Sequence, residues 1–149
     1  MRLWHYKLIP SLPKKQLVSQ WRECILIAKN ISEKGTPNHI LVNNIMNYDM
    51  NDFRDYCNCV LVEMVKRGYH ISEKSINKLG DYIDFFVDSS RANNNLIFVG
   101  WHDWQYLKIC MTNMYEKCFY ANGKSKIGLD EFKKLNDKYK ECTGENFTI

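Results

Sequence analysis

The chain has 149 residues, of which 45% are hydrophobic and 26% charged, and its formal net charge is +4. These values are typical of one globular domain with a single core, and the modest positive charge permits an anionic partner without requiring one. No stretch approaches 18 consecutive apolar residues, which excludes a transmembrane helix.

The chain opens with apolar residues that predict an extended N-terminal arm, in which Pro10 delays entry into a helix. The first helix is expected over residues 13–30, with Pro13 at its first position and Ser11 as a nearby cap. Apolar residues recur along it at the period of an amphipathic helix. They are Leu17, Trp21, Cys24, Ile25 and Ala28.

Four more segments carry helical signals. Residues 49–67 follow Asp49 as a cap and end at Gly68. Their apolar stripe is Phe53, Tyr56, Cys57, Val60, Leu61 and Met64. Ser72 opens a third helical pattern, whose apolar residues are Ile76, Leu79, Ile83 and Phe86. The fourth covers residues 103–120, begins near Asp103 and contains Leu107, Cys110, Met111, Met114 and Cys118. A more polar helix is expected over residues 129–141.

The connecting segments are less distinct. Loops are expected at residues 31–38, 88–101 and 121–128, and residues 39–46 fit either a helical segment or a loop. Only Leu96–Val99 reads as a strand. We therefore predict an all-α, compact, single-domain monomer in which residues 1–123 form the helical domain. Residues 124–149 are expected to form a C-terminal helical extension, packed on that domain or trailing from it.

The cysteines and histidines give no metal-binding pattern. No signal peptide is evident in the first twenty residues, so we expect a cytoplasmic protein with free thiols. No close pair lies at zinc-ribbon spacing, and no two histidines lie at i, i+4 on one helix. The six cysteines are Cys24, Cys57, Cys59, Cys110, Cys118 and Cys142.

The N-terminus is the first candidate for chemistry. Arg2 is too bulky for the usual removal of Met1, so a free Met1 α-amine is expected. An unperturbed α-amine has a pKa of about 7.7–8.0, well below the value of about 10.4 for a lysine. A useful fraction is then neutral near pH 7 and able to attack an aldehyde-like carbon. The apolar residues that follow, including Trp4, are expected to fix the arm against the helices.

A second candidate lies on the first predicted helix. Arg22 and Glu23 project away from its apolar stripe when the residues are placed at 100° intervals. The pair can therefore face a groove, although a solvated ion pair on a surface helix has the same pattern.

These residues resemble the pyrimidine-dimer DNA glycosylase family, also called phage-type endonuclease V. The resemblance rests on Arg2, on residues 16–23 (Gln-Leu-Val-Ser-Gln-Trp-Arg-Glu), on residues 63–71 (Glu-Met-Val-Lys-Arg-Gly-Tyr-His-Ile) and on the later helix from His102 to Lys117. It covers residues 1–120, and the opening Met-Arg-Leu-Trp-His looks like a bacterial branch of the family.

The resemblance implies an all-α enzyme that needs no metal and no cofactor. In that family an N-terminal amine expels the damaged base and forms an imine, and a glutamate supports strand breakage by β-elimination. Carried over to this chain, the amine is that of Met1 and the glutamate is Glu23. The partner is damaged double-stranded DNA, which we expect to be contacted by Arg2, Arg22, Lys14, Lys15 and His39.

Two departures leave alternatives open. Leu26 replaces an arginine that the phage type carries one turn beyond Arg22, and residues 124–149 replace its aromatic C-terminal segment. The substrate is therefore a pyrimidine dimer, an oxidised base or an abasic site. A non-catalytic nucleic-acid-binding module of the same fold and a helical interaction protein are the competing readings.

Overall fold

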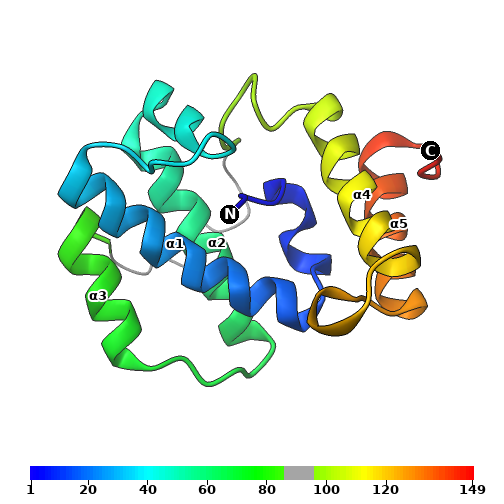
Figure 1. Cartoon of the computed structure of the whole chain (residues 1–149), viewed down its shortest axis with the longest axis horizontal. Coiled ribbons are helices and arrows are strands. Elements are labelled where there is room, and N and C mark those ends of the chain that lie inside the picture. Colours follow the sequence, from blue (N-terminus) through cyan, green and yellow to red (C-terminus); the bar gives the residue numbers. More distant parts are fainter. Residues whose placement is uncertain (86–95) are drawn as a thin grey trace.

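The structure is a computed structural model that describes residues 1–85 and 96–149 (Figure 1). Every regular element in these two ranges is a helix, which confirms the all-α prediction. The elements are η1 (Tyr6–Ser11), α1 (Lys14–Lys34), η2 (Asn43–Asn47), α2 (Met50–Lys66), α3 (Glu73–Ile83), α4 (Trp104–Phe119), η4 (Gly123–Ser125) and α5 (Leu129–Thr143), where η denotes a 3-10 helix.

The helices form two groups with the N-terminal segment between them. Helix α1 packs against α2 and α3, and α4 packs against α5. The short helix η1 contacts both α2 and α5, so it joins the two groups (Figure 1). The N-terminus consequently lies in the interior of the arrangement and not at its edge.

The N-terminal arm differs from the extended conformation that we predicted. Residues 6–11 form a 3-10 helix that contains Pro10, whose fixed φ suits a helix and whose missing N–H needs no partner in so short a segment. Leu3, Leu8 and Ile9 are buried. Burial of each such side chain contributes roughly 1.5–3 kcal/mol, so the arm is anchored and does not trail.

The cap predicted at Asp49 is confirmed, and Ser72 and Asp103, which lie where the next two helical patterns begin, are caps as well. The side chains of Asp49, Ser72 and Asp103 each accept a hydrogen bond from a backbone N–H in the first turn of α2, α3 and α4. The apolar stripes predicted for α2 and α4 are fully buried, as are Leu79 and Ile83 of α3. Helix α1 differs at its start, because Pro13 precedes its first residue and Ser11 belongs to η1.

Two predictions about the connecting segments are wrong, and the structure decides a third that allowed two alternatives. Helix α1 continues to Lys34 and ends at Gly35, whose φ of +73° is in the left-handed region. Residues 39–46 form a turn followed by most of η2. Phe98 has a φ of +54° and lies in a turn, so Leu96–Val99 is not a strand. Phe86 and most of the 88–101 loop lie outside the described residues.

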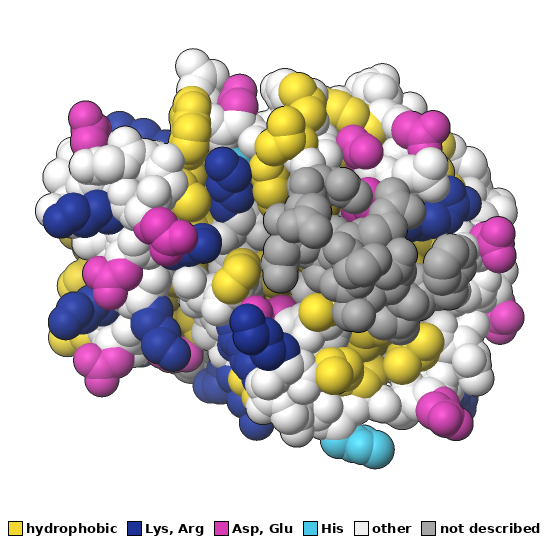
Figure 2. Space-filling view, turned by 180° about the vertical axis from the view of Figure 1, so that it is seen from behind, with side chains coloured by type: hydrophobic (Ala, Val, Ile, Leu, Met, Phe, Trp, Pro, Cys, Tyr) yellow, Lys and Arg dark blue, Asp and Glu magenta, His cyan; other side chains and the backbone are white. Residues whose placement is uncertain are grey.

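The surface carries mixed charge. In the face shown in Figure 2, Lys and Arg side chains alternate with Asp and Glu side chains over the side formed by α4 and α5. All six cysteines are free. Within residues 1–85 and 96–149, no helix combines the length and apolarity needed to cross a bilayer.

Candidate active site

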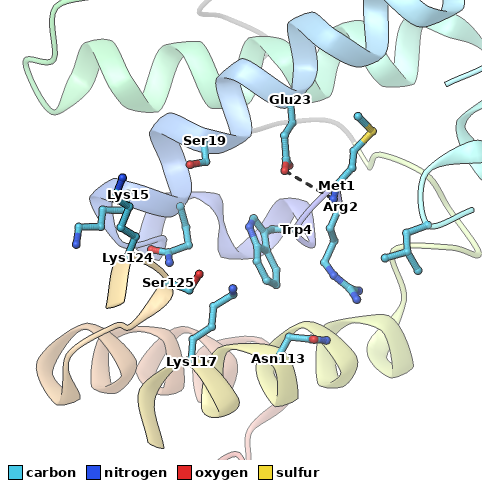
Figure 3. Close-up of a pocket in the computed structure, with 12 residues that line it drawn as sticks. Met1, Arg2, Trp4, Lys15, Ser19, Glu23, Asn113, Lys117, Lys124 and Ser125 are labelled. Atoms are coloured by element: carbon cyan, nitrogen blue, oxygen red, sulfur yellow. Dashed lines mark ion pairs between the residues drawn. The ribbon is translucent and has the colours of Figure 1, made fainter. Parts of the chain in front are cut away.

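A cavity of about 420 Å³ lies where the N-terminal arm meets α1, α4 and η4 (Figure 3). Its walls therefore come from both helix groups. The described residues that line it are Met1, Arg2, Trp4, Lys15, Gln16, Ser19, Glu23, Leu41, Asn113, Lys117, Lys124 and Ser125.

The chain begins inside this cavity, opposite an acid. The Met1 nitrogen lies 4.0 Å from Oε1 of Glu23, and the two side chains are 13% and 31% exposed. Figure 3 shows the Glu23 side chain extending from α1 toward the first residue of the arm. An amine and a carboxylate are thus held face to face in a site that a ligand can enter.

Gln20 fixes this geometry. Its side chain is fully buried, and its Oε1 accepts a hydrogen bond from the Trp4 N–H at 2.9 Å. Its Nε2 donates to the Arg2 carbonyl at 2.9 Å and to Oε2 of Glu23 at 3.3 Å. One amide group therefore positions the backbone of the arm and the carboxylate together.

Two tyrosines also hold the backbone of the arm. The Tyr56 hydroxyl donates to the Trp4 carbonyl at 2.5 Å, and the Tyr106 hydroxyl donates to the Leu3 carbonyl at 2.5 Å. Burial raises the pKa of both phenols above the ordinary value. Both hydroxyls therefore remain protonated donors across the physiological pH range.

A pair of neutral histidines completes the anchorage. Nδ1 of His5 accepts the Lys7 N–H at 3.2 Å, so its Nε2 carries the proton and donates to the His102 carbonyl at 2.8 Å. Desolvation by burial lowers the pKa of His5 to about 4. The ring is consequently uncharged near neutral pH, in a tautomer that suits both hydrogen bonds.

The environment of Glu23 makes it a weaker acid than usual. Desolvation by burial raises its pKa, and the charges of the Met1 amine, His39 and Lys117, together with the Arg2 N–H, offset part of that rise. A carboxyl group with a raised pKa holds its proton at a higher pH than an ordinary glutamate, which suits a group that must both accept and return a proton.

Four cationic side chains line the cavity beside this pair: Arg2, Lys15, Lys117 and Lys124. None of the four forms an ion pair with an acidic side chain in residues 1–85 or 96–149. The Arg2 guanidinium carbon lies 5.8 Å from the centre of the Trp4 ring. Such a concentration of unpaired positive charge favours an anionic ligand such as a phosphodiester.

The residues predicted from sequence divide into two groups. Met1, Arg2, Lys15 and Glu23 line the cavity, whereas Lys14, Arg22 and His39 do not. Nζ of Lys14 lies 5.1 Å from the centre of the Tyr69 ring. Arg22 is exposed on α1. Nδ1 of His39 accepts the Leu41 N–H at 3.2 Å, and Leu41 is part of the cavity wall.

Several site residues were missed by the sequence analysis. Lys117 and Lys124 look like ordinary surface lysines in the sequence, so no signal distinguishes them. Gln16 and Gln20 do carry a signal, because they interrupt the buried side of α1 at i, i+4 spacing. A buried amide needs hydrogen-bond partners, and those of Gln20 include the arm.

Comparison with known proteins gives one match. A family model described as pyrimidine dimer DNA glycosylase matches residues 1–77, which run from Met1 into α3. The matched range includes Arg2 and Glu23 and excludes Lys117 and Lys124. No curated protein and no solved structure matches the chain.

Proposed function

The chain belongs to the pyrimidine dimer DNA glycosylase family, and we propose that it is a DNA-repair glycosylase with AP-lyase activity. Its partner is damaged double-stranded DNA, and the lesion is a pyrimidine dimer or a related one. We further propose that it acts as a monomer. The chemistry calls for neither a metal nor a cofactor, since an amine supplies both the nucleophile and, as an iminium, the electron sink.

One observation supports this proposal above the others. The Met1 nitrogen lies 4.0 Å from the Glu23 carboxylate, inside a cavity lined by four cationic side chains that form no ion pair with the described acidic residues. A lysine in the same place would be mostly protonated at neutral pH, whereas an α-amine is partly neutral. The arrangement suits nucleophilic attack by an amine on a sugar next to phosphates.

In the first step the neutral Met1 amine attacks C1′ of the deoxyribose that bears the damaged base. The new N–C1′ bond forms as the glycosidic bond breaks, and the base leaves with the bonding electron pair. The leaving base takes up the proton that the attacking nitrogen loses. The nitrogen lone pair then breaks the C1′–O4′ bond, O4′ takes a proton from water, and the open sugar is left as an iminium. Glu23, which faces the nitrogen, stabilises the developing positive charge.

In the second step the iminium makes the C2′ proton acidic. Glu23 accepts that proton, the electrons move toward the iminium, and the bond between C3′ and its phosphate oxygen breaks. Hydrolysis of the remaining imine releases the amine. The raised pKa of Glu23 favours its acting as a proton acceptor and later as a donor.

In this proposal, the basic side chains in and around the cavity bind the phosphates of the DNA backbone. Arg2 and Lys15 line the cavity and are proposed to contact phosphates there. Arg22, Lys14 and His39 lie outside it and are proposed to contact the flanking strand. Leu26, which is 45% exposed on α1, leaves an apolar surface where a further phosphate contact would otherwise lie.

Borohydride trapping tests the nucleophile. Duplexes with a pyrimidine dimer, an oxidised pyrimidine or an abasic site should each be incubated with the protein and reduced. We expect a stable adduct with at least one of them, located by mass spectrometry on the N-terminal peptide. Glu23→Gln should still form adduct with abasic DNA but lose strand cleavage by at least about a hundredfold, as expected for loss of a general base.

The matched control compares tags at the two ends of the chain. An uncleaved N-terminal tag removes the Met1 amine and should abolish trapping, whereas the same tag after Ile149 should not. An adduct on Lys15, Lys117 or Lys124 would reassign the nucleophile. Failure to trap any of the three lesions would refute the proposal.

The alternative is a non-catalytic nucleic-acid-binding module of the same fold. The position of Arg22 outside the cavity and the exposed Leu26 favour it. It predicts salt-sensitive DNA binding that does not depend on a free N-terminus. The two tagged proteins therefore distinguish the alternatives.

A further inference from the structure

The loop between α1 and η2 presents apolar side chains at the rim of the cavity. Ile40 is 86% exposed and Leu41 is 44% exposed. Leu41 also lines the cavity that contains Met1. Figure 1 shows this loop reaching from the end of α1 toward the N-terminus. Two aliphatic side chains, adjacent in the chain, thus stand beside the proposed site of chemistry.

The loop is held in this conformation by its own hydrogen bonds. The His39 carbonyl accepts the N–H groups of Val42 and Asn43 at 3.0 and 2.9 Å, and the His39 N–H donates to Oδ1 of Asn43 at 2.9 Å. Asn38 has a φ of +59°, which turns the chain sharply before Ile40. The tip is therefore a preformed projection whose apolar side chains remain in water.

The proposed chemistry requires a change in the DNA that the amine alone does not supply. The sugar carbon of a stacked nucleotide is shielded, so the nucleotide must be unstacked or extruded before attack. Proteins that kink DNA commonly insert an aliphatic side chain between base pairs, at a cost of a few kcal/mol per step. The unpaired cations of the adjoining cavity attract the phosphates that would bring a base step to this rim.

We propose that Ile40 and Leu41 form a wedge that inserts between base pairs at the lesion and keeps the damaged nucleotide unstacked. The inference rests on the proposed function, because the loop can insert only into duplex DNA that the proposed site has bound. Ile40, the more exposed residue, enters the stack. Leu41 closes the cavity behind it. Both are positioning residues and neither reacts.

The test uses a duplex with 2-aminopurine next to an abasic-site analogue, because this base becomes more fluorescent when unstacked. Wild-type protein should raise the fluorescence on binding. Ile40→Ala should lower that rise and should slow cleavage of an abasic duplex by about tenfold, in line with the loss of one inserted side chain. Cleavage of single-stranded abasic DNA, which needs no unstacking, should stay within about twofold of wild type.

Two variants serve as matched controls. Ile40→Leu retains an aliphatic group of the same size and should restore both the fluorescence and duplex cleavage. Leu129→Ala removes an aliphatic side chain that is 68% exposed on α5 and should leave both unchanged. These controls separate insertion into DNA from a general effect of removing exposed apolar surface.

The fluorescence measurement needs binding alone, so it separates this inference from the chemistry. An Ile40-dependent rise without any trapped adduct would refute the lyase proposal and support the wedge. Equal fluorescence and duplex cleavage for wild type and Ile40→Ala would overturn the wedge, as would an equal loss on single-stranded DNA. An effect of Ile40→Ala on self-association alone would assign the loop to a contact between chains and also overturn it.

Discussion

Glu23 experiences opposing influences on its charge. Burial against the arm and α1 raises its pKa, whereas the Met1 amine, His39 and Lys117 lower it. The net rise means that the carboxyl group binds a proton more tightly in the folded chain than in the unfolded chain. A proton acceptor that must be ionised to work will then lose activity at a higher pH than an ordinary glutamate does.

The first residue-scale prediction concerns Lys117→Ala. Its positive charge lowers the pKa of Glu23, so its removal should raise that pKa further. The acid limb of the pH profile of kcat/KM for strand cleavage should therefore move to higher pH. Lys108→Ala, which removes an exposed lysine from the same helix, should leave the limb in place. An unshifted limb in Lys117→Ala would show that Glu23 does not limit the rate at low pH.

At the scale of elements, the N-terminal segment acts as a structural joint. Helix η1 contacts α2 and α5, and the residues before it are fixed by Gln20, Tyr56 and Tyr106. The chain terminus therefore has a defined position, although it lies outside every helix of the described residues. The precision of the site depends on these side-chain bonds to the backbone of the arm.

Gln20→Ala tests this dependence. It leaves the buried Trp4 N–H and the Arg2 carbonyl without their partner, which should destabilise the fold by about 2–4 kcal/mol. Because the arm also loses its register against Glu23, borohydride trapping should fall by at least about tenfold at a temperature where the variant is folded. Urea unfolding and trapping measure the two effects. Gln105→Ala, at an exposed position of α4, is the control, and full trapping by Gln20→Ala would contradict the proposed role.

At the scale of the whole molecule, the sequence predicts the helices well, because caps and hydrophobic periodicity are set by residues close together in the chain. Asp49, Ser72 and Asp103 act as caps because each lies immediately before a helix, and hydrophobic periodicity identifies the buried stripes. The strand predicted at Leu96–Val99 is wrong, because these β-branched and aromatic residues lead into a tight turn. The 3-10 helix of residues 6–11 does not follow from the sequence pattern, because Pro10 disfavours a long α-helix but is compatible with one short 3-10 segment.

Only some residues of the candidate site can be predicted from the sequence. Met1 and Glu23 were predicted from the free α-amine and from the polar face of the first helix, and the family resemblance added Arg2. Lys117 and Lys124 were not, because they reach the cavity only through the packing of α4 and η4 against the arm. Long-range packing of this kind leaves no periodic pattern around a single surface lysine.

Salt dependence tests this composite site at the scale of the whole molecule. The net charge is only +4 and Figure 2 shows mixed charge on one face, so DNA affinity should come mainly from the cavity cations. Lys124→Ala should lower the slope of log K against log salt concentration by about 1. Fluorescence anisotropy with an abasic-analogue duplex measures the slope. Lys133→Ala on α5 should leave it unchanged, and an equal decrease there would locate the binding outside the cavity.

The cavity contains the first residue of the chain and Lys124 near its end. During synthesis the amine emerges from the ribosome long before its opposite wall has been translated. A nascent chain therefore carries the proposed nucleophile without Lys117 and Lys124, which complete the cavity. In the proposed mechanism, the site is therefore complete only when α4 and η4 have been released and have docked.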